Sequence, residues 1–68
     1  MTDTKALRET IESSGMKYKH IAASVGLTPY GLQKKIDNDS EFKGSEIAKL
    51  CQLLGLSIYD KERIFFSH

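Results

Sequence analysis

The sequence predicts an all-α protein, a compact bundle of about five short helices. Apolar residues recur at spacings of three and four, and glycines fall where these periodic stretches end. No stretch alternates with the two-residue period of a strand over more than a few residues. At 68 residues the chain is expected to form a single domain that spans residues 1–68.

The first two helices are bounded by capping residues. The first is expected to begin at residues 2–4, where Thr, Asp and Thr can each accept a hydrogen bond from a free backbone N–H. Leu7 and Ile11 share its apolar face, and Gly15 ends it in the left-handed conformation that helix ends favour. The second helix ends at Gly26 and carries apolar residues at i, i+3, i+4 and i+7, namely Tyr18, Ile21, Ala22 and Val25.

The third helix opens with Thr28 and Pro29. Threonine can cap the helix, and proline at the first helical position already has the required φ. Leu32 and Ile36 form the apolar stripe, and the polar residues 37–40 are typical of a loop.

Two further helices are expected after this loop. The fourth runs from about Gly44 or Ser45 to Leu54, with Gly55 after its end, and its apolar face consists of Ile47, Leu50, Cys51 and Leu54. Ser57 with Asp60 three residues later resembles a capping box and starts a last helix through Ile64 to about Phe66.

Composition excludes several classes of protein. No apolar run approaches the ~20 residues that a membrane span requires, and no signal peptide is visible. Cys51 is the only cysteine, and with two histidines, His20 and His68, no zinc set or cofactor site is expected. There is no glycine-rich phosphate loop and no Ser/His/Asp or Cys/His pairing, so the chain is not expected to be an enzyme. A small domain without cross-links points to the cytoplasm.

Charge is unevenly distributed along the chain. Residues 16–36 contain four lysines and no acid, whereas the rest of the chain has six cations and nine anions. Such a separation suggests one face that meets a polyanion. Lysines are also common on solvated surfaces, so charge alone leaves a plain solvent-facing surface equally open.

The stretch from Tyr18 to Ile36 carries the functional signal. Its two helices are separated by a turn of about three residues, which forces a steep crossing angle. A small residue is needed where the helices approach each other, and Ala22 is in place. The core between them is expected to consist of Ile21, Val25, Leu27, Leu32 and Ile36.

At these residues the sequence resembles the Cro and phage-repressor type of helix-turn-helix proteins. The resemblance covers residues 21–22, 25–27 and 28–36, and Phe42, Ile47, Leu50 and Leu54 fit the later helices of that family. It implies a domain of about five helices that binds duplex DNA in the major groove. It further implies a homodimeric transcriptional regulator, such as a repressor, in the cytoplasm of a bacterial or phage-infected cell and associated with the nucleoid. The chain departs from the family pattern at Lys17 and at the pair Pro29 and Tyr30.

Helix geometry then assigns the side chains that would read bases. Because Leu32 and Ile36 face the core, the opposite side of the third helix, from about Thr28 to Asp37, would enter the groove. Gln33 can pair with adenine, Lys34 with guanine, Tyr30 with a thymine methyl group or a phosphate, and Asp37 with a cytosine amino group. The base-contacting set is Thr28, Pro29, Tyr30, Gln33, Lys34 and Asp37. Close approach to DNA or to the neighbouring helix would account for glycine at position 31, and chance is an equal alternative.

Phosphate contacts are expected on both sides of this helix. Two lysines lie at the start of the second helix, and two more flank the loop after the third, where neutral donors are also available. The phosphate-contacting set is Lys17, Lys19, Lys35, Asn38, Ser40 and Lys43.

Two questions stay open at this stage. Phe65 and Phe66 cannot both face one core, so one of them either closes the core alone or is offered to a second copy of the chain. A protein-interaction module of antirepressor or antitoxin type is an alternative function, and a DNA-binding accessory protein of recombination is another.

Overall fold

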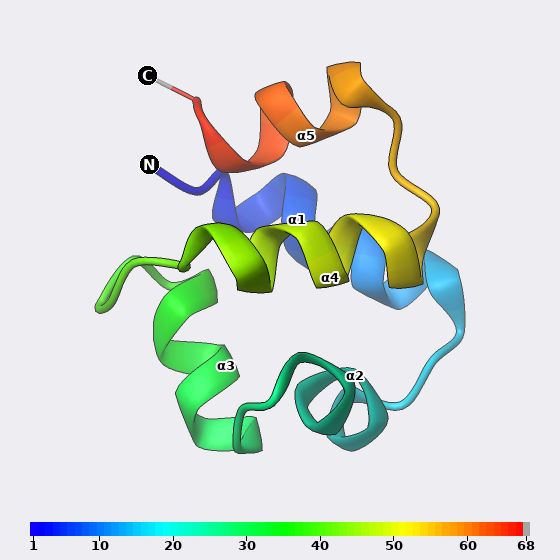
Figure 1. Cartoon of the computed structure of the whole chain (residues 1–68), viewed down its shortest axis with the longest axis vertical. Coiled ribbons are helices and arrows are strands. Elements are labelled where there is room, and N and C mark those ends of the chain that lie inside the picture. The colour runs from blue at the N-terminus through cyan, green and yellow to red at the C-terminus, as the bar shows by residue number, and fades with distance from the viewer. Residues whose placement is uncertain (68) are drawn as a thin grey trace.

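The computed structural model describes residues 1–67, and these residues form five α-helices and no strand (Figure 1). The helices are α1 (Thr4–Ser14), α2 (Tyr18–Val25), α3 (Pro29–Ile36), α4 (Gly44–Leu54) and α5 (Ile58–Phe65). The radius of gyration is 10.5 Å. The predicted all-helical fold is confirmed for these residues, while His68 lies outside them.

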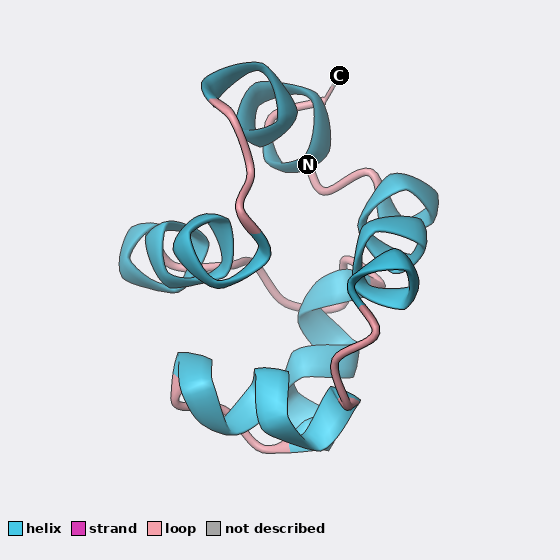
Figure 2. Ribbon diagram, turned by 90° about the vertical axis from the view of Figure 1, so that its right-hand side faces the viewer, coloured by secondary structure: helices cyan, strands magenta, loops and turns pink. Residues whose placement is uncertain are grey.

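The helices surround a common core in three levels. In the view of Figure 1, α4 and α1 form the middle level, α5 lies above them, and α2 and α3 lie below. Figure 2 shows α1 and α4 on opposite sides of the core. α4 packs against α1, α2 and α5, while α3 packs against α1 and α2. The N-terminus and the end of α5 lie close together, on the side away from α2.

Each helix contributes at least one fully buried side chain to the core. Burial of one such aliphatic side chain favours folding by about 1.5–3 kcal/mol. The largest fully buried residues are Leu7, Ile21, Leu32, Ile36, Leu50 and Ile64.

The helix ends form where the capping residues were expected. Asp3 accepts a hydrogen bond from the Ala6 N–H at 3.0 Å and so caps α1. Ser57 accepts one from the Asp60 N–H at 3.1 Å, and the Asp60 carboxylate accepts one in return from the Ser57 N–H at 3.4 Å. Glycines in the left-handed conformation follow α1, α2 and α4, at Gly15, Gly26 and Gly55.

The two adjacent phenylalanines have different environments. Phe65 is buried and meets Phe42 edge to face, with ring centroids 5.5 Å apart. Phe66 follows α5 and is 45% exposed. Phe65 therefore closes the core, and Phe66 is left at the surface.

Two further findings concern the thiol of Cys51 and the question of a membrane-spanning helix. Cys51 is half-buried against the core, and burial raises the pKa of its thiol, which disfavours the reactive thiolate. Among the described helices, none combines the length and the apolar character needed to cross a membrane.

Candidate nucleic-acid interface

The connection between α2 and α3 consists of Gly26, Leu27 and Thr28. Gly26 has φ of 83°, a conformation that other residues rarely adopt, and the Leu27 N–H donates to the Ala22 carbonyl at 2.9 Å. The chain thereby turns sharply, and in Figure 1 α2 is seen almost along its axis while α3 runs up the view. Ala22 is fully buried, and Leu27 packs against the core.

The first turn of α3 is fixed by its own residues. The Thr28 hydroxyl accepts a hydrogen bond from the Gly31 N–H at 3.0 Å, and Pro29 stands at the first helical position. A Cβ at position 31 would lie 3.1 Å from the same hydroxyl, and that oxygen is the sole close neighbour it would meet. A larger residue here would require the hydroxyl to move by a few tenths of an ångström, and no atom of the neighbouring helix lies within 4 Å of this position, so a close approach of that helix does not account for glycine.

The solvent-facing side of α3 carries three large polar side chains. Leu32 and Ile36 are completely buried, whereas Tyr30 is 71% exposed and Gln33 and Lys34 are also exposed. The Lys34 ammonium lies 5.7 Å from the centre of the Tyr30 ring, within range of a cation–π contact. Thr28 and Pro29 are exposed at the start of the helix, so five of the expected base-reading residues are accessible on or next to α3.

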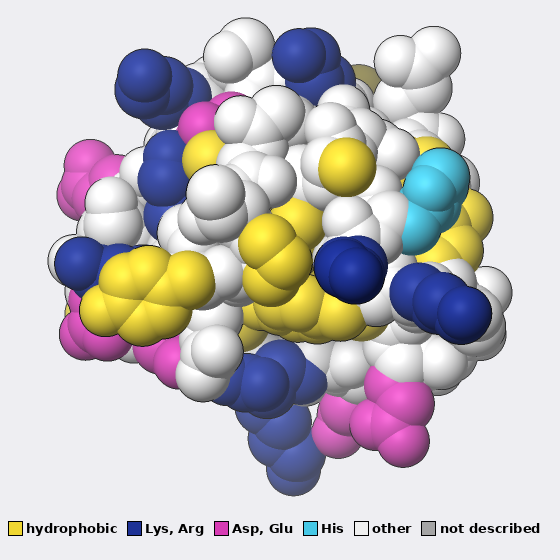
Figure 3. All heavy atoms as spheres, turned by 90° about the horizontal axis from the view of Figure 1, so that it is seen from below, with side chains coloured by type: hydrophobic (Ala, Val, Ile, Leu, Met, Phe, Trp, Pro, Cys, Tyr) yellow, Lys and Arg dark blue, Asp and Glu magenta, His cyan; other side chains and the backbone are white. Residues whose placement is uncertain are grey.

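Exposed lysines lie on the elements around this surface. Lys17 and Lys19 stand at the start of α2, while Ser40 and Lys43 lie between α3 and α4. None of these three lysines has an ion pair within residues 1–67. Figure 3 shows the molecule from below, where basic side chains are spread around exposed apolar atoms and acidic side chains lie at the margins.

Lys35 is not available for phosphate, which corrects the sequence-based assignment. Its ammonium lies 2.6 Å from the Glu46 carboxylate, and the two side chains are only 12% and 9% exposed. The same carboxylate accepts a hydrogen bond from the Lys43 N–H at 2.8 Å, at the start of α4. Burial alone would raise the pKa of Glu46, but these hydrogen bonds and the charges of both lysines outweigh it and hold the pKa below its usual range. Lys35 therefore joins α3 to α4.

Asp37 also has a partner within the protein. Asp37 follows the last residue of α3, and its carboxylate lies 2.6 Å from the Arg8 guanidinium of α1. The side chain is thus directed to α1, and it would have to leave this partly exposed ion pair to contact a base.

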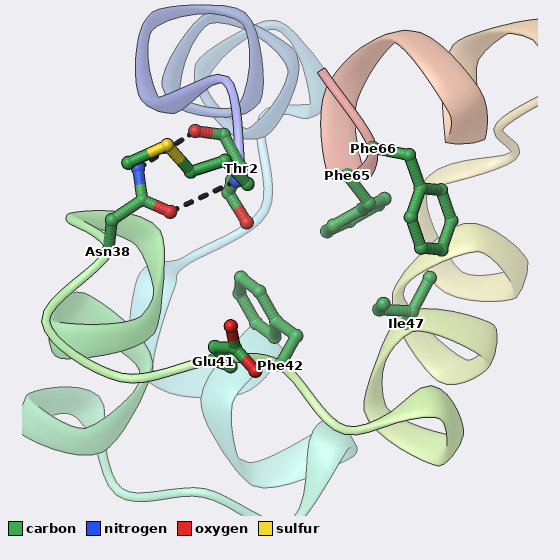
Figure 4. A pocket seen from close by; sticks show the side chains of 8 residues that line it. Thr2, Asn38, Glu41, Phe42, Ile47, Phe65 and Phe66 are labelled. Atoms are coloured by element: carbon green, nitrogen blue, oxygen red, sulfur yellow. Dashed lines mark hydrogen bonds between the residues drawn. The ribbon is translucent and has the colours of Figure 1, made fainter. Parts of the chain in front are cut away.

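Asn38 is the third residue whose assignment changes. Its carboxamide accepts a hydrogen bond from the Thr2 N–H at 3.0 Å and donates one to the Thr2 carbonyl at 2.9 Å. Both sides of the amide are therefore engaged by the N-terminal segment (Figure 4). A side chain held in this way is not free to donate to phosphate.

Sequence reasoning missed several residues that support the surface. Arg8 and Glu46 come from other helices, and no local pattern links them to α3. The Tyr18 hydroxyl is buried and has no hydrogen-bond partner among the described residues. Burial raises the pKa of Tyr18, the charge of Arg8 opposes this, and that of Asp37 adds to it, so the hydroxyl lies in the field of the Arg8–Asp37 pair.

The exposed groups on and beside α3 are hydrogen-bond donors and cations. Such a set can contact base edges and phosphates. Within the described residues, no group of three or more His, Cys, Asp or Glu side chains is placed to hold a metal ion. In comparisons with known proteins, no protein-family model, curated protein or solved structure matches the chain.

Proposed function

We propose that this protein binds duplex DNA in a sequence-dependent manner, as a small transcriptional regulator of Cro type. One observation carries the proposal: α3 exposes Tyr30, Gln33 and Lys34, whereas its apolar residues Leu32 and Ile36 are completely buried. A short connection from α2 and an exposed helix start are the features with which helix-turn-helix proteins enter the major groove.

The reading side chains differ in what they can recognise. The Gln33 carboxamide can pair with the N6 and N7 edge of adenine, and the Lys34 ammonium can donate to O6 and N7 of guanine. Tyr30 offers a ring to a thymine methyl group, and its contact with Lys34 would orient both side chains. Each good bidentate contact would discriminate between bases by roughly 1–3 kcal/mol.

Phosphate contacts would come from the residues around α3. Lys17 and Lys19 are proposed to meet one strand at the start of α2, and Ser40 and Lys43 the other strand beside α4. These contacts would position the protein without reading sequence.

The affinity for duplex DNA is expected to fall steeply as salt rises. With Lys35 paired to Glu46, the lysines left to displace counterions are Lys17, Lys19, Lys34 and Lys43. Four contacts predict a slope of log affinity against log salt of roughly −3 to −4. Fluorescence anisotropy titrations at several salt concentrations measure it, and a slope near zero would contradict the proposal.

Loss of a base contact and loss of a phosphate contact are expected to cause different defects in DNA binding. At a duplex selected from a random pool, Gln33→Ala or Lys34→Ala should weaken binding by roughly 1–3 kcal/mol and relax the preference at one base position. Lys19→Ala should weaken binding to the selected and a scrambled duplex alike, because phosphates are the same in every sequence. Titration of all three variants against both duplexes measures the difference.

Lys61→Ala serves as a control for the loss of any lysine, because this residue lies on α5, on the far side of α4 from α2. The affinity of Lys61→Ala for the selected duplex should remain close to that of the wild type. A change of sequence preference in Lys19→Ala but not in Gln33→Ala or Lys34→Ala would place the reading surface elsewhere.

A protein-interaction module is the second candidate, favoured by apolar side chains at the start of α5. Ile58 is 75% and Tyr59 83% exposed, far from the tip of α3. Failure to select any duplex, together with a salt-independent partner, would favour this function. A recombination accessory role would instead show as binding by a monomer with weak sequence preference.

We also propose a second copy of the chain as a partner, with Phe66 at the contact. This ring borders a hollow of about 350 Å³ whose wall includes Phe42, Ile47 and Phe65 (Figure 4). A symmetric dimer would present two α3 helices to two half-sites, about one helical turn of DNA apart. The stoichiometry and spacing of the selected duplexes test this arrangement.

A further inference from the structure

The C-terminal end of α3 is attached to the N-terminal segment of the chain by three separate contacts. The first is made by the Asn38 carboxamide, which pairs with both backbone groups of Thr2 and also donates to the Thr4 hydroxyl at 3.4 Å. Asn38 has φ of 66°, and it is the one residue other than glycine in residues 1–67 with a positive φ. The unusual backbone conformation directs the amide towards the N-terminal segment and turns the chain into the α3–α4 loop.

The second and third contacts come from α1 itself. The Thr4 hydroxyl donates to the Ile36 carbonyl at 2.6 Å, and this carbonyl belongs to the last turn of α3, where backbone acceptors lack partners within the helix. Arg8 reaches Asp37 one turn further along α1. Three consecutive residues, 36–38, are thus held by α1 and the segment before it.

The N-terminal segment is itself anchored on its other side. The Asp3 N–H donates to the Ile64 carbonyl of α5 at 2.6 Å, and the Ser67 hydroxyl donates to the Met1 carbonyl at 3.0 Å. Figure 4 shows Thr2 between Asn38 on one side and the end of α5 on the other. The segment therefore connects the end of α3 to a helix that α3 does not extensively contact.

We infer that Thr4 and Asn38 are positioning residues for DNA binding: they fix the end of α3 and the loop that carries Ser40 and Lys43 relative to the core. This inference rests on the proposed function. The reading side chains Tyr30, Gln33 and Lys34 lie on α3 itself, so a shift of the end of this helix relative to the core would misplace the base contacts and the phosphate contacts of the loop. Neither residue contacts DNA in this scheme.

The experiment compares Thr4→Val and Asn38→Gly with two matched variants. Valine keeps the shape of threonine and removes the hydroxyl, while Thr4→Ser retains it. Glycine at position 38 keeps the positive φ without strain and removes only the carboxamide. Ser57→Ala removes a helix cap on α5 and destabilises the fold without touching the end of α3. Affinity for the selected duplex is measured at a temperature where every variant is fully folded.

Thr4→Val and Asn38→Gly are expected to weaken binding by about three- to tenfold, the range that corresponds to the loss of one or two hydrogen bonds. The salt slope should stay at the wild-type value, because no cation is lost. Thr4→Ser should bind nearly as well as the wild type, and so should Ser57→Ala. Wild-type affinity in Thr4→Val, or an equal loss in Ser57→Ala, would overturn the inference.

Amide hydrogen exchange separates this inference from the proposed function. Exchange at residues 36–40 should become several-fold faster in Thr4→Val and Asn38→Gly, while exchange in the middle of α4 stays unchanged. If the wild type binds no duplex, the proposed function fails, and the positioning role in DNA binding fails with it. Faster exchange would then show that the contacts hold α3 for another purpose, and unchanged exchange would show that they do not hold it.

Discussion

Replacement of Leu32 with alanine is expected to lower the free energy of unfolding by roughly 2–5 kcal/mol. Leu32 is completely buried, and it anchors the middle of α3 against the core. Removal of three carbon atoms leaves a cavity that the short helix cannot fill without moving its exposed side. Urea denaturation followed by circular dichroism measures the change.

The neighbouring residue provides the control. Gln33 is exposed on the opposite side of α3, so Gln33→Ala should change the free energy of unfolding by less than about 0.5 kcal/mol. The two variants should therefore have opposite profiles: Leu32→Ala is unstable, and Gln33→Ala is stable but impaired in binding DNA. Equal destabilisation by both would contradict the orientation of α3.

Replacement of Glu46 with alanine is expected to lower the free energy of unfolding by about 3 kcal/mol. The carboxylate is buried, and it satisfies both the Lys35 ammonium and the Lys43 N–H. Its removal leaves a positive charge without a partner in a largely buried position. Glu62→Ala, which removes an exposed carboxylate of α5, should have little effect in the same denaturation experiment.

The free energy of unfolding should also decrease as the pH falls, because folding lowers the pKa of Glu46. Because folding lowers the pKa of this carboxyl group, its contribution is fully present above the pKa of the unfolded chain. The contribution is lost as the pH falls through the lower pKa of the folded protein. Glu46→Gln should therefore flatten the decrease in stability below the usual carboxyl range, and an unchanged pH profile would exclude this role.

Helix positions could be predicted from the sequence because their causes are local. Asp3, Thr28 and Ser57 each accept a hydrogen bond from the N–H three residues later, so their effect needs no knowledge of the rest of the fold. The orientation of α3 was predictable for a similar reason. Leu32 and Ile36 lie four residues apart, and this spacing alone places Gln33 and Lys34 on the outer side.

The residues whose assignments change make contacts between distant parts of the chain. Asp37 and Asn38 are held by Arg8 and Thr2, which lie 29 and 36 residues earlier. Lys35 meets Glu46 on the next helix, where the usual capping signature is absent because a lysine occupies the capping position. The sequence gives no local sign that a polar residue after a helix has a partner elsewhere in the chain, so the partner is found only in the folded structure.

The first turn of α3 couples two positions, Thr28 and Gly31. A Cβ at position 31 would lie 3.1 Å from the Thr28 hydroxyl, so alanine there requires this oxygen to move by a few tenths of an ångström. Alanine favours a helix by about 1 kcal/mol over glycine, and the displaced hydroxyl would weaken the cap, so the two effects of Gly31→Ala oppose each other. The effect of Gly31→Ala on the free energy of unfolding should therefore depend on the residue at position 28, and a double-mutant cycle with Thr28→Ala measures this coupling.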